Sequence, residues 1–339
     1  MLTLGVIGCG YWGPNLVRNF HNQPDARVTR VADLSRERLQ HMEMLYPFLE
    51  TTQDHRELIE DPGMDAIVIS TPVTTHYKLA KEALEAGKHV FLEKPLTHNA
   101  AESLELVKLA EAKGLVGMVG HTFLYSPAVM KIKELVDGGE LGEVHYISTI
   151  RVNLGLFQDD INVVWDLAPH DISIFNFIFG SVPDHVNAVG HDYIQPEIED
   201  VAFLTFRYPK GKLAHVHVSW LDPNKIRKTT VVGSKKMLVY DDVSTLEKIR
   251  VYDKGVDVHR HYDTFGEFHL AYRFGDISIP KLADGEPLKA ETAHFLDCIR
   301  RGTPCRSSFL HGHQVVVALE HACRSMGDSG GETAIDYGL

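Results

Sequence analysis

A glycine-rich segment near the start of the chain has the residue types and the spacing of a phosphate-binding turn. Gly8-Cys9-Gly10-Tyr11-Trp12-Gly13 follows a short apolar run and precedes a helical pattern. Gly8 permits a tight turn, Gly10 lets the backbone approach a pyrophosphate, and Gly13 lets the helix pack closely on the strand. Asp33 lies 20 residues beyond Gly13, where a carboxylate accepts a hydrogen bond from the adenosine ribose and repels a 2′-phosphate. The segment therefore predicts a bound dinucleotide, NAD rather than NADP.

Other polar residues follow later apolar runs, at the edge where open α/β sheets bind ligands. The segment Thr71–His76 follows one such run and either lines the cofactor or caps the next helix, and Glu93-Lys94 ends the following run. Arg36 keeps NADP as the less favoured alternative, because an arginine just after the acidic residue can hold a 2′-phosphate. The expected cofactor contacts are Gly8, Gly10, Tyr11, Trp12, Gly13, Asp33, Arg36, Thr71, Pro72, His76, Glu93 and Lys94.

A second set of chemical groups lies on a predicted helix over Val164–Ile178. Asp166 and His170 are four residues apart, so they share one helix face, and we place Pro169 in the first turn. A histidine that titrates near neutrality is suited to act as a general base, and the carboxylate can orient it or a hydroxyl group. The alternatives are a buried structural histidine and a metal site of Asp166, His170 and Asp171. We predict no metal, because no further ligand cluster accompanies these residues.

The elements that must position these groups divide the chain in two. Before about residue 120, short apolar runs alternate with helical patterns, which predicts a doubly wound parallel sheet with strands at Leu2–Ile7, Val28–Ala32, Phe48–Thr51, Ala66–Ser70, His89–Leu92 and Leu115–Val119. Alternating runs later in the chain predict a mostly antiparallel sheet with strands at Val144–Val152, Val186–Gly190, Ala202–Tyr208, Lys212–Trp220 and Thr229–Val232. A further helical pattern runs from Thr292 to about Met326. We therefore expect a dinucleotide-binding Rossmann domain over 1–122 and an α+β substrate-binding and oligomerisation domain over 123–339.

Composition excludes several classes of protein. The chain has 339 residues with 44% hydrophobic and 24% charged residues, which is typical of a globular protein. Its net charge of −12 opposes binding to nucleic acid or to anionic lipid. Runs of apolar or glycine residues such as Gly114–Gly120 are far too short to span a bilayer. The first residues lack a signal-peptide pattern, so we expect a cytoplasmic protein whose four cysteines are reduced thiols.

Three motifs together resemble the Gfo/Idh/MocA oxidoreductase family. They are the turn Gly8–Gly13, the tripeptide Glu93-Lys94-Pro95 and the segment Asp166-Leu167-Ala168-Pro169-His170. The resemblance implies a Rossmann domain joined to an α+β domain that faces a carbohydrate. It further implies that Lys94 and His170 face the reacting carbon and that Asp166 is the companion carboxylate found in inositol-type members.

Finer similarities suggest the class of substrate. Gly10–Asn15 together with Trp165–His170 resembles the branch associated with sugar-nucleotide and deoxysugar pathways. Independently, the basic stretch Lys225–Lys236 and the preceding Trp220 offer cations and an aromatic surface to a nucleoside diphosphate, although exposed strand-end charges are the simpler interpretation. The expected substrate contacts are Lys94, Tyr125, Arg151, Asn153, Asn162, Asp166, His170, Trp220 and Arg227.

The sequence thus predicts an NAD-dependent oxidoreductase that oxidises a secondary hydroxyl of a sugar, namely C3 of a UDP-N-acetylhexosamine. The alternatives are a 3-ketosugar reductase, an inositol or free-sugar dehydrogenase, an NAD-dependent glycosidase and a non-catalytic NAD-binding regulator. We expect a homodimer or homotetramer, because the second sheet lacks enough predicted helices to cover both of its faces.

Overall fold

The chain forms two compact units in a computed structural model that describes residues 1–258 and 270–339. Unit 1 comprises Met1–Ser126, Gly285–Glu320 and Tyr337–Leu339, and unit 2 comprises Pro127–Asp284 and His321–Asp336. This division differs from the predicted domains 1–122 and 123–339, because the segment Gly285–Glu320 folds with the first unit. The physical reason is core packing: the ring of Phe295 lies 6.0 Å from that of Phe20 and 5.7 Å from that of Phe91.

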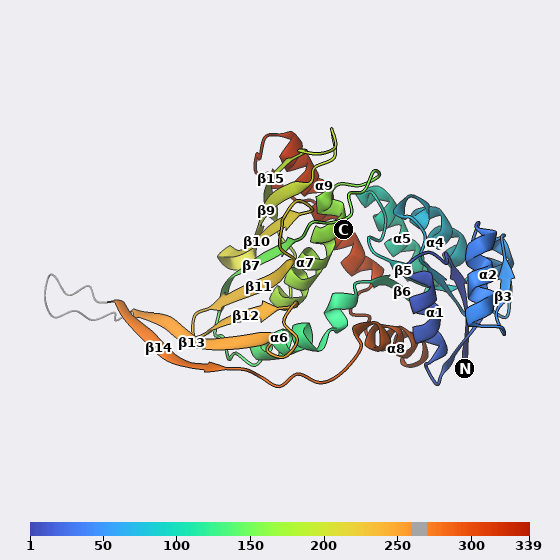
Figure 1. Cartoon of the computed structure of the whole chain (residues 1–339), viewed down its shortest axis with the longest axis horizontal. Helices are drawn as coiled ribbons and strands as arrows, with labels where there is room; N and C mark the ends of the chain where they lie inside the picture. Colours follow the sequence, from blue (N-terminus) through green and yellow to red (C-terminus); the bar gives the residue numbers. More distant parts are fainter. Residues whose placement is uncertain (259–269) are drawn as a thin grey trace, which may run out of the picture. The chain divides into compact units, whose positions relative to one another are not determined.

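Unit 1 is built on a parallel six-stranded sheet with the order β3-β2-β1-β4-β5-β6 (Figure 1). This order confirms the predicted doubly wound sheet. The apolar runs form its strands because they are buried on both faces, as in β4, where every residue is buried. The strands are β1 (Leu2–Ile7), β2 (Ala26–Ala32), β3 (Glu50–Thr52), β4 (Ala66–Ile69), β5 (His89–Glu93) and β6 (Gly117–Gly120).

Helices connect these strands and cover the sheet. Two pairs pack side by side, α1 with α8 and α4 with α5. Helix α5 begins at an Asn99 cap, whose side chain accepts a hydrogen bond from the Glu102 amide, and ends at Gly114 in the left-handed conformation. The helices are α1 (Gly13–His21), α2 (Arg36–Leu45), α3 (Arg56–Ile59), η1 (Val73–Thr75), α4 (His76–Glu85), α5 (Ala100–Lys113), η2 (Thr122–Tyr125), α8 (Pro287–Arg301) and α9 (Phe309–Gly327), which continues into unit 2.

Unit 2 is a nine-stranded sheet with helices α6 (Pro127–Asp137) and α7 (Val163–Phe179) (Figure 1). The pair β7–β10 is parallel and the other pairs are antiparallel, which confirms the predicted mostly antiparallel sheet. Helix α7 packs against β7, β9 and β10. The strands are β7 (Val144–Val152), β8 (His185–His191), β9 (Val201–Tyr208), β10 (Lys212–Ser219), β11 (Ile226–Gly233), β12 (Met237–Asp241), β13 (Ile249–Val258), β14 (Leu270–Ser278) and β15 (Thr333–Ala334), and a short 3-10 turn η3 (Pro209–Gly211) joins β9 to β10.

None of the helices within residues 1–258 and 270–339 combines the length and the apolar character that a bilayer crossing requires.

Candidate functional site

The three glycines of the turn after β1 have different geometric reasons to be glycine. Gly8 has a φ of +96°, and a Cβ atom there would lie 2.6 Å from the Ser70 carbonyl oxygen. A Cβ atom at Gly13 would lie 2.3 Å from the carbonyl oxygen of Gly8, so only glycine lets α1 start this close to the strand. At Gly10 the nearest atom is the Arg38 Nη1, 3.8 Å away, which leaves room for a ligand against the backbone.

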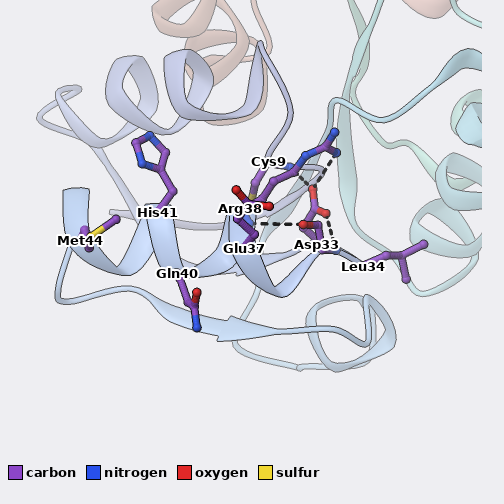
Figure 2. A pocket seen from close by; sticks show the side chains of 9 residues that line it. Cys9, Asp33, Leu34, Glu37, Arg38, Gln40, His41 and Met44 are labelled. Atoms are coloured by element: carbon purple, nitrogen blue, oxygen red, sulfur yellow. Dashed lines mark hydrogen bonds and ion pairs between the residues drawn. The ribbon is translucent and has the colours of Figure 1, made fainter.

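The carboxylate of Asp33, directly after β2, is held by the backbone around it. Its Oδ2 accepts a hydrogen bond from the Cys9 amide at 2.6 Å, and its Oδ1 accepts one from the Ser35 amide at 2.8 Å. The side chain is 6% exposed, and Arg38 Nη1 lies 3.7 Å from Oδ2. Figure 2 shows the carboxylate between the glycine-rich turn and α2, with Arg38 beside it. Asp33 thus links the glycine-rich turn after β1 to the end of β2.

Asp33 lines a pocket of about 710 Å³. Helix α2 supplies one wall of it, including Arg38. Sequence reasoning missed Arg38 and named Arg36, whose guanidinium instead lies 3.4 Å from the Glu43 carboxylate. The signal for Arg38 was available, because it lies one helical turn beyond Ser35, the N-cap of α2. The pocket is lined by Cys9, Asp33, Leu34, Ser35, Glu37, Arg38, Gln40, His41 and Met44.

The two aromatic residues of the turn, Tyr11 and Trp12, lie at its surface. Tyr11 is 86% exposed and Trp12 is 43% exposed, and their rings meet edge to face at 5.7 Å. Apolar rings of this size are usually covered in a folded protein, and here they directly follow the open backbone of Gly10. Their position is compatible with contacts to a cofactor at the turn.

The turns after β4 and β5 are joined by a buried histidine. His76 is 1% exposed, and its two ring nitrogens lie 2.9 Å from the carbonyl oxygens of Thr71 and Pro95. Burial lowers the pKa of His76, and its hydrogen bonds to the two carbonyl groups oppose this shift. The ring nitrogens of His76 therefore bind the backbone rather than a ligand. In the same turn the Thr75 hydroxyl donates to the Pro72 carbonyl oxygen and to the Thr71 hydroxyl. His76 positions the turn that carries Lys94.

Glu93, which precedes Lys94, and Glu291 on α8 form an acidic pair with raised pKa values. Burial raises the pKa of Glu93 to about 7, although the residue keeps some exposed surface and its carboxylate accepts a 3.3 Å hydrogen bond from the Lys94 amide. Glu291 on α8 is fully buried, and burial together with the nearby Glu93 raises its pKa well above the ordinary value. The Thr122 hydroxyl donates to Glu291 Oε2 at 2.7 Å. Burial and the nearby Glu93 thus favour the protonated form of the Glu291 carboxyl.

Buried His121 and partly exposed His311 accompany these acids in unit 1. The rings of His121 and His311 meet edge to face at 5.4 Å. Burial lowers the pKa of both groups, that of His311 to about 4, and each is a neutral imidazole near pH 7. Glu291 and His121 could not be identified from local sequence patterns, because their neighbours come from distant parts of the chain.

In unit 2, helix α7 carries the predicted pair Asp166 and His170 one turn apart. The helix begins at Asn162, whose side chain caps it by accepting a hydrogen bond from the Trp165 amide at 3.2 Å. Because Val163 is the first helical residue, Pro169 lies in the second turn and not in the first as predicted. The carboxylate of Asp166 accepts a 2.9 Å hydrogen bond from the indole Nε1 of Trp220.

Two predicted substrate contacts have structural partners in the core of unit 2. Arg151 is 6% exposed and forms a two-point ion pair with Asp171, at 2.7 and 3.0 Å. Trp220 is 1% exposed, so its ring offers no open surface to a base and instead supports Asp166. Since Asp171 is bound by Arg151, the alternative metal site of Asp166, His170 and Asp171 loses one of its ligands.

The remaining predicted substrate contacts are dispersed. Tyr125 is 4% exposed in the core of unit 1, where its hydroxyl lies 2.9 Å from the Ser307 Oγ and burial raises its pKa. Asn162 donates to Glu199 in addition to capping α7. The guanidinium of Arg227 on β11 lies 3.7 Å from the Asp242 carboxylate. Asn153 follows β7, and its backbone N–H group donates a hydrogen bond to the Ser219 carbonyl oxygen. These contacts give Tyr125 and Asn162 structural roles.

Comparisons with known proteins agree with this architecture. Residues 2–121 match the oxidoreductase family with an NAD-binding Rossmann fold, and residues 129–239 match the GFO/IDH/MocA C-terminal domain. The chain is 26% identical to a myo-inositol 2-dehydrogenase of Thermotoga maritima, over 84% of this chain and 90% of that protein. It is 29% identical to the uncharacterized oxidoreductase YrbE of Bacillus subtilis, over 63% of this chain and 65% of that protein, slightly under two thirds of its length.

A solved structure has the same fold. The UDP-N-acetylglucosamine 3-dehydrogenase GnnA from Acidithiobacillus ferrooxidans superposes with a TM-score of 0.80 and 23% identity, covering 96% of this chain and 98% of that one. The two family matches cover most of the chain and correspond to its two sheets. The protein therefore belongs to the Gfo/Idh/MocA family of oxidoreductases.

Proposed function

We propose that this protein is an NAD-dependent dehydrogenase that oxidises a secondary hydroxyl of a sugar, namely C3 of a UDP-linked N-acetylhexosamine. The observation that supports it most is on α7, where Asp166 and His170 share one face and buried Trp220 holds the Asp166 carboxylate. A fixed carboxylate beside an imidazole is suited to orient a sugar hydroxyl and to accept its proton. The fold of GnnA supports a nucleotide sugar, and the inositol dehydrogenase relative supports the alternative of a cyclitol or free sugar.

The residues of the glycine-rich turn fit an NAD molecule. The open backbone at Gly10 and the start of α1 suit a pyrophosphate, and the Asp33 carboxylate suits the adenosine ribose. The negative charge of Asp33 disfavours a 2′-phosphate, whereas the neighbouring Arg38 attracts one. The carboxylate is the more buried of the two charges, with 6% of its side chain exposed against 58% for Arg38, and we therefore assign the preference to NAD.

In the proposed chemistry two residues act on the same substrate hydroxyl. His170 accepts the hydroxyl proton, Lys94 donates a hydrogen bond to the same oxygen, and Asp166 orients a neighbouring hydroxyl or the imidazole itself. When bound, NAD supplies the acceptor for the hydride that leaves the carbon. The products are a ketosugar, NADH and a proton on His170, so the two electrons and the proton balance.

A substrate panel tests the proposal. Purified protein is incubated with NAD and, separately, with UDP-N-acetylhexosamines, UDP-hexoses, inositols and free sugars, and NADH is followed by its absorbance. We expect net NADH with a UDP-N-acetylhexosamine. NADH formed only from inositols or free sugars contradicts the proposed substrate. Cleavage of a glycoside without NADH indicates the glycosidase alternative. The absence of any reaction contradicts the proposal that the protein is an enzyme.

We further propose that unit 2 mediates a homodimer or homotetramer. Apolar side chains on three neighbouring strands of its sheet remain between 37% and 44% exposed, namely Tyr146, Ile150, Phe203 and Leu213. Tyr146 and Leu213 are paired in register across β7 and β10, so they lie next to each other. A patch of this kind favours association with a second copy. Light scattering at micromolar concentration should give a dimer or tetramer that Phe203→Glu weakens, and a monomer of the unaltered protein contradicts the proposal.

A further inference from the structure

Three side chains near the end of α8 form a cluster that the proposed reaction does not use. His294 and Cys298 are four residues apart on the helix, and Cys305 follows the helix beyond its Gly302 cap. One imidazole nitrogen and the two Sγ atoms all lie within 4.8 Å of one another. Cys298 is 3% exposed, and Cys305 is partly exposed at the end of an exposed stretch, residues 301–304. Two thiols from different parts of one short segment are thus brought together.

Hydrogen bonding to the backbone sets the tautomer of His294. The Arg306 amide donates to the Nε2 atom of His294 at 3.1 Å. Because Nε2 uses its lone pair to accept this bond, the proton of the neutral imidazole is on Nδ1, which is then a donor. Hydrogen bonds from Cys305 and from His294 lower the pKa of the Cys298 thiol, against the effect of burial. The hydrogen bond between the two thiols, together with burial, raises the pKa of Cys305. These contacts favour the thiolate form of Cys298 and the thiol form of Cys305.

The same tautomer argues against a zinc site. Zinc would be bound by two thiolates and an imidazole nitrogen with an available lone pair. Binding at Nε2 would displace the Arg306 amide. Binding at Nδ1 would move the proton to Nε2, where it would point at the N–H group of Arg306. Both arrangements break the hydrogen bond from the Arg306 amide to His294 Nε2, whereas a reaction between the two sulfur atoms leaves this hydrogen bond intact.

We propose that Cys298 and Cys305 are a site of reversible oxidation, at which hydrogen peroxide converts the two thiols into an intramolecular disulfide. The Cys298 thiolate attacks one peroxide oxygen and forms an S–O bond, while the O–O bond breaks and the departing hydroxide takes up a proton as water. The Cys305 sulfur then attacks the sulfenic sulfur, forming the S–S bond, and the displaced hydroxide leaves as water with the Cys305 proton. Two electrons pass from the sulfurs to the peroxide. A dithiol reductant reverses the step by thiol exchange.

The surroundings of Cys305 connect this site to the segment after β6. The next residue, Arg306, lies 4.7 Å from the centre of the Tyr125 ring, and Ser307 contacts the Tyr125 hydroxyl and accepts a 2.8 Å hydrogen bond from the Val119 amide. A disulfide would tie this segment to α8, which already holds Thr122 through Glu291. The tether would therefore restrain the 3-10 turn η2 from two directions.

Mass spectrometry of the full chain tests the site without depending on catalysis. The protein is treated with hydrogen peroxide, unfolded, alkylated and digested. We expect the unaltered protein to lose two hydrogen atoms, to yield a linked peptide containing Cys298 and Cys305, and to keep Cys9 and Cys323 alkylatable, with full reversal by dithiothreitol. Cys9 is the internal reference for an unreactive thiol, because burial raises its pKa to about 12.

Variants separate the two steps. In Cys305→Ser the oxidation should stop at a Cys298 sulfenic acid, which dimedone traps. Cys298→Ser should yield neither the sulfenic acid nor the linked peptide. The matched control Cys323→Ser should behave as the unaltered protein. His294→Gln should slow disulfide formation about tenfold near neutral pH, since it removes one donor to the thiolate. Retention of both thiols in oxidised unaltered protein overturns the proposal. So does one equivalent of zinc in the purified protein that protects both thiols from alkylation.

Discussion

The indole Nε1 of Trp220 donates a 2.9 Å hydrogen bond to the Oδ2 of Asp166. The ring is buried and lies 5.7 Å from that of Phe157, so its orientation is set by packing rather than by solvent. Asp166 is thereby held in one position on the face of α7 that it shares with His170. Trp220 acts on the proposed chemistry only through this carboxylate.

Replacing Trp220 should therefore reduce turnover through Asp166. Trp220→Phe keeps an aromatic ring but removes the donor, and loss of a hydrogen bond to a charged group lowers kcat/KM by about tenfold. The test is a double-mutant cycle with Asp166→Ala, measured as kcat/KM. In the Asp166→Ala background the second substitution should have no further effect on kcat/KM, and fully additive losses would contradict the role given to Trp220.

The Arg151–Asp171 pair should behave as a structural element. Arg151→Met leaves a buried carboxylate without its partner, and we expect it to lower the free energy of unfolding by about 3 to 5 kcal/mol. The double variant Arg151→Met/Asp171→Leu should recover much of this loss, because it removes both charges. Urea unfolding measures both effects. If Arg151→Met instead leaves stability unchanged and raises KM for the sugar, Arg151 is a substrate contact after all.

The choice of cofactor should depend on Asp33 and Arg38 together. The unaltered protein should bind NAD at least tenfold more tightly than NADP, a difference of about 1.4 kcal/mol. Asp33→Ala should reduce this preference because it removes the charge that repels the 2′-phosphate. Adding Arg38→Ala should then weaken NADP selectively. The matched control is Arg36→Ala, which alters an arginine paired with Glu43 and should leave the ratio of the two dissociation constants unchanged.

The cofactor turn and the pair on α7 could be predicted because their signals are local. The turn lies within six residues, and Asp166 and His170 follow helical spacing. The partners of these groups could not be predicted, since Trp220 lies 54 residues from Asp166 and Arg151 lies 20 residues from Asp171. The helical pattern after Thr292 was recognised, but its packing in unit 1 depends on Phe295 meeting Phe20 and Phe91. Contacts between residues so far apart in the chain produce no local pattern from which they could be predicted.

The stability of the protein should fall as the pH rises, partly because of Glu291. Its folded pKa is raised above the unfolded value, so the stabilisation is complete below about pH 4.5 and is lost as the pH rises toward the folded pKa. Within this window a single proton contributes a slope of about 1.4 kcal/mol per pH unit. Glu291→Gln should therefore flatten the dependence.

Urea unfolding between about pH 5 and 8 measures this slope. Glu111→Gln is the matched control, because it makes the same change at an exposed position and should leave the slope unaltered. The pKa of Glu93 is raised to about 7, so in both variants Glu93 should still cause part of the fall in the free energy of unfolding with rising pH. An identical slope in the Glu291→Gln protein would contradict a buried, protonated Glu291.

The central claim is that His170 is the base of an NAD-dependent oxidation, and the turnover of His170→Ala tests it most directly. With the best substrate of the panel and saturating NAD, kcat should fall by about 10² to 10⁴, while the dissociation constant for NAD stays nearly unchanged. Lys94→Ala should give a similar loss, and the double variant should be only modestly worse than the poorer single variant. A kcat for His170→Ala within about threefold of the unaltered protein would contradict the account.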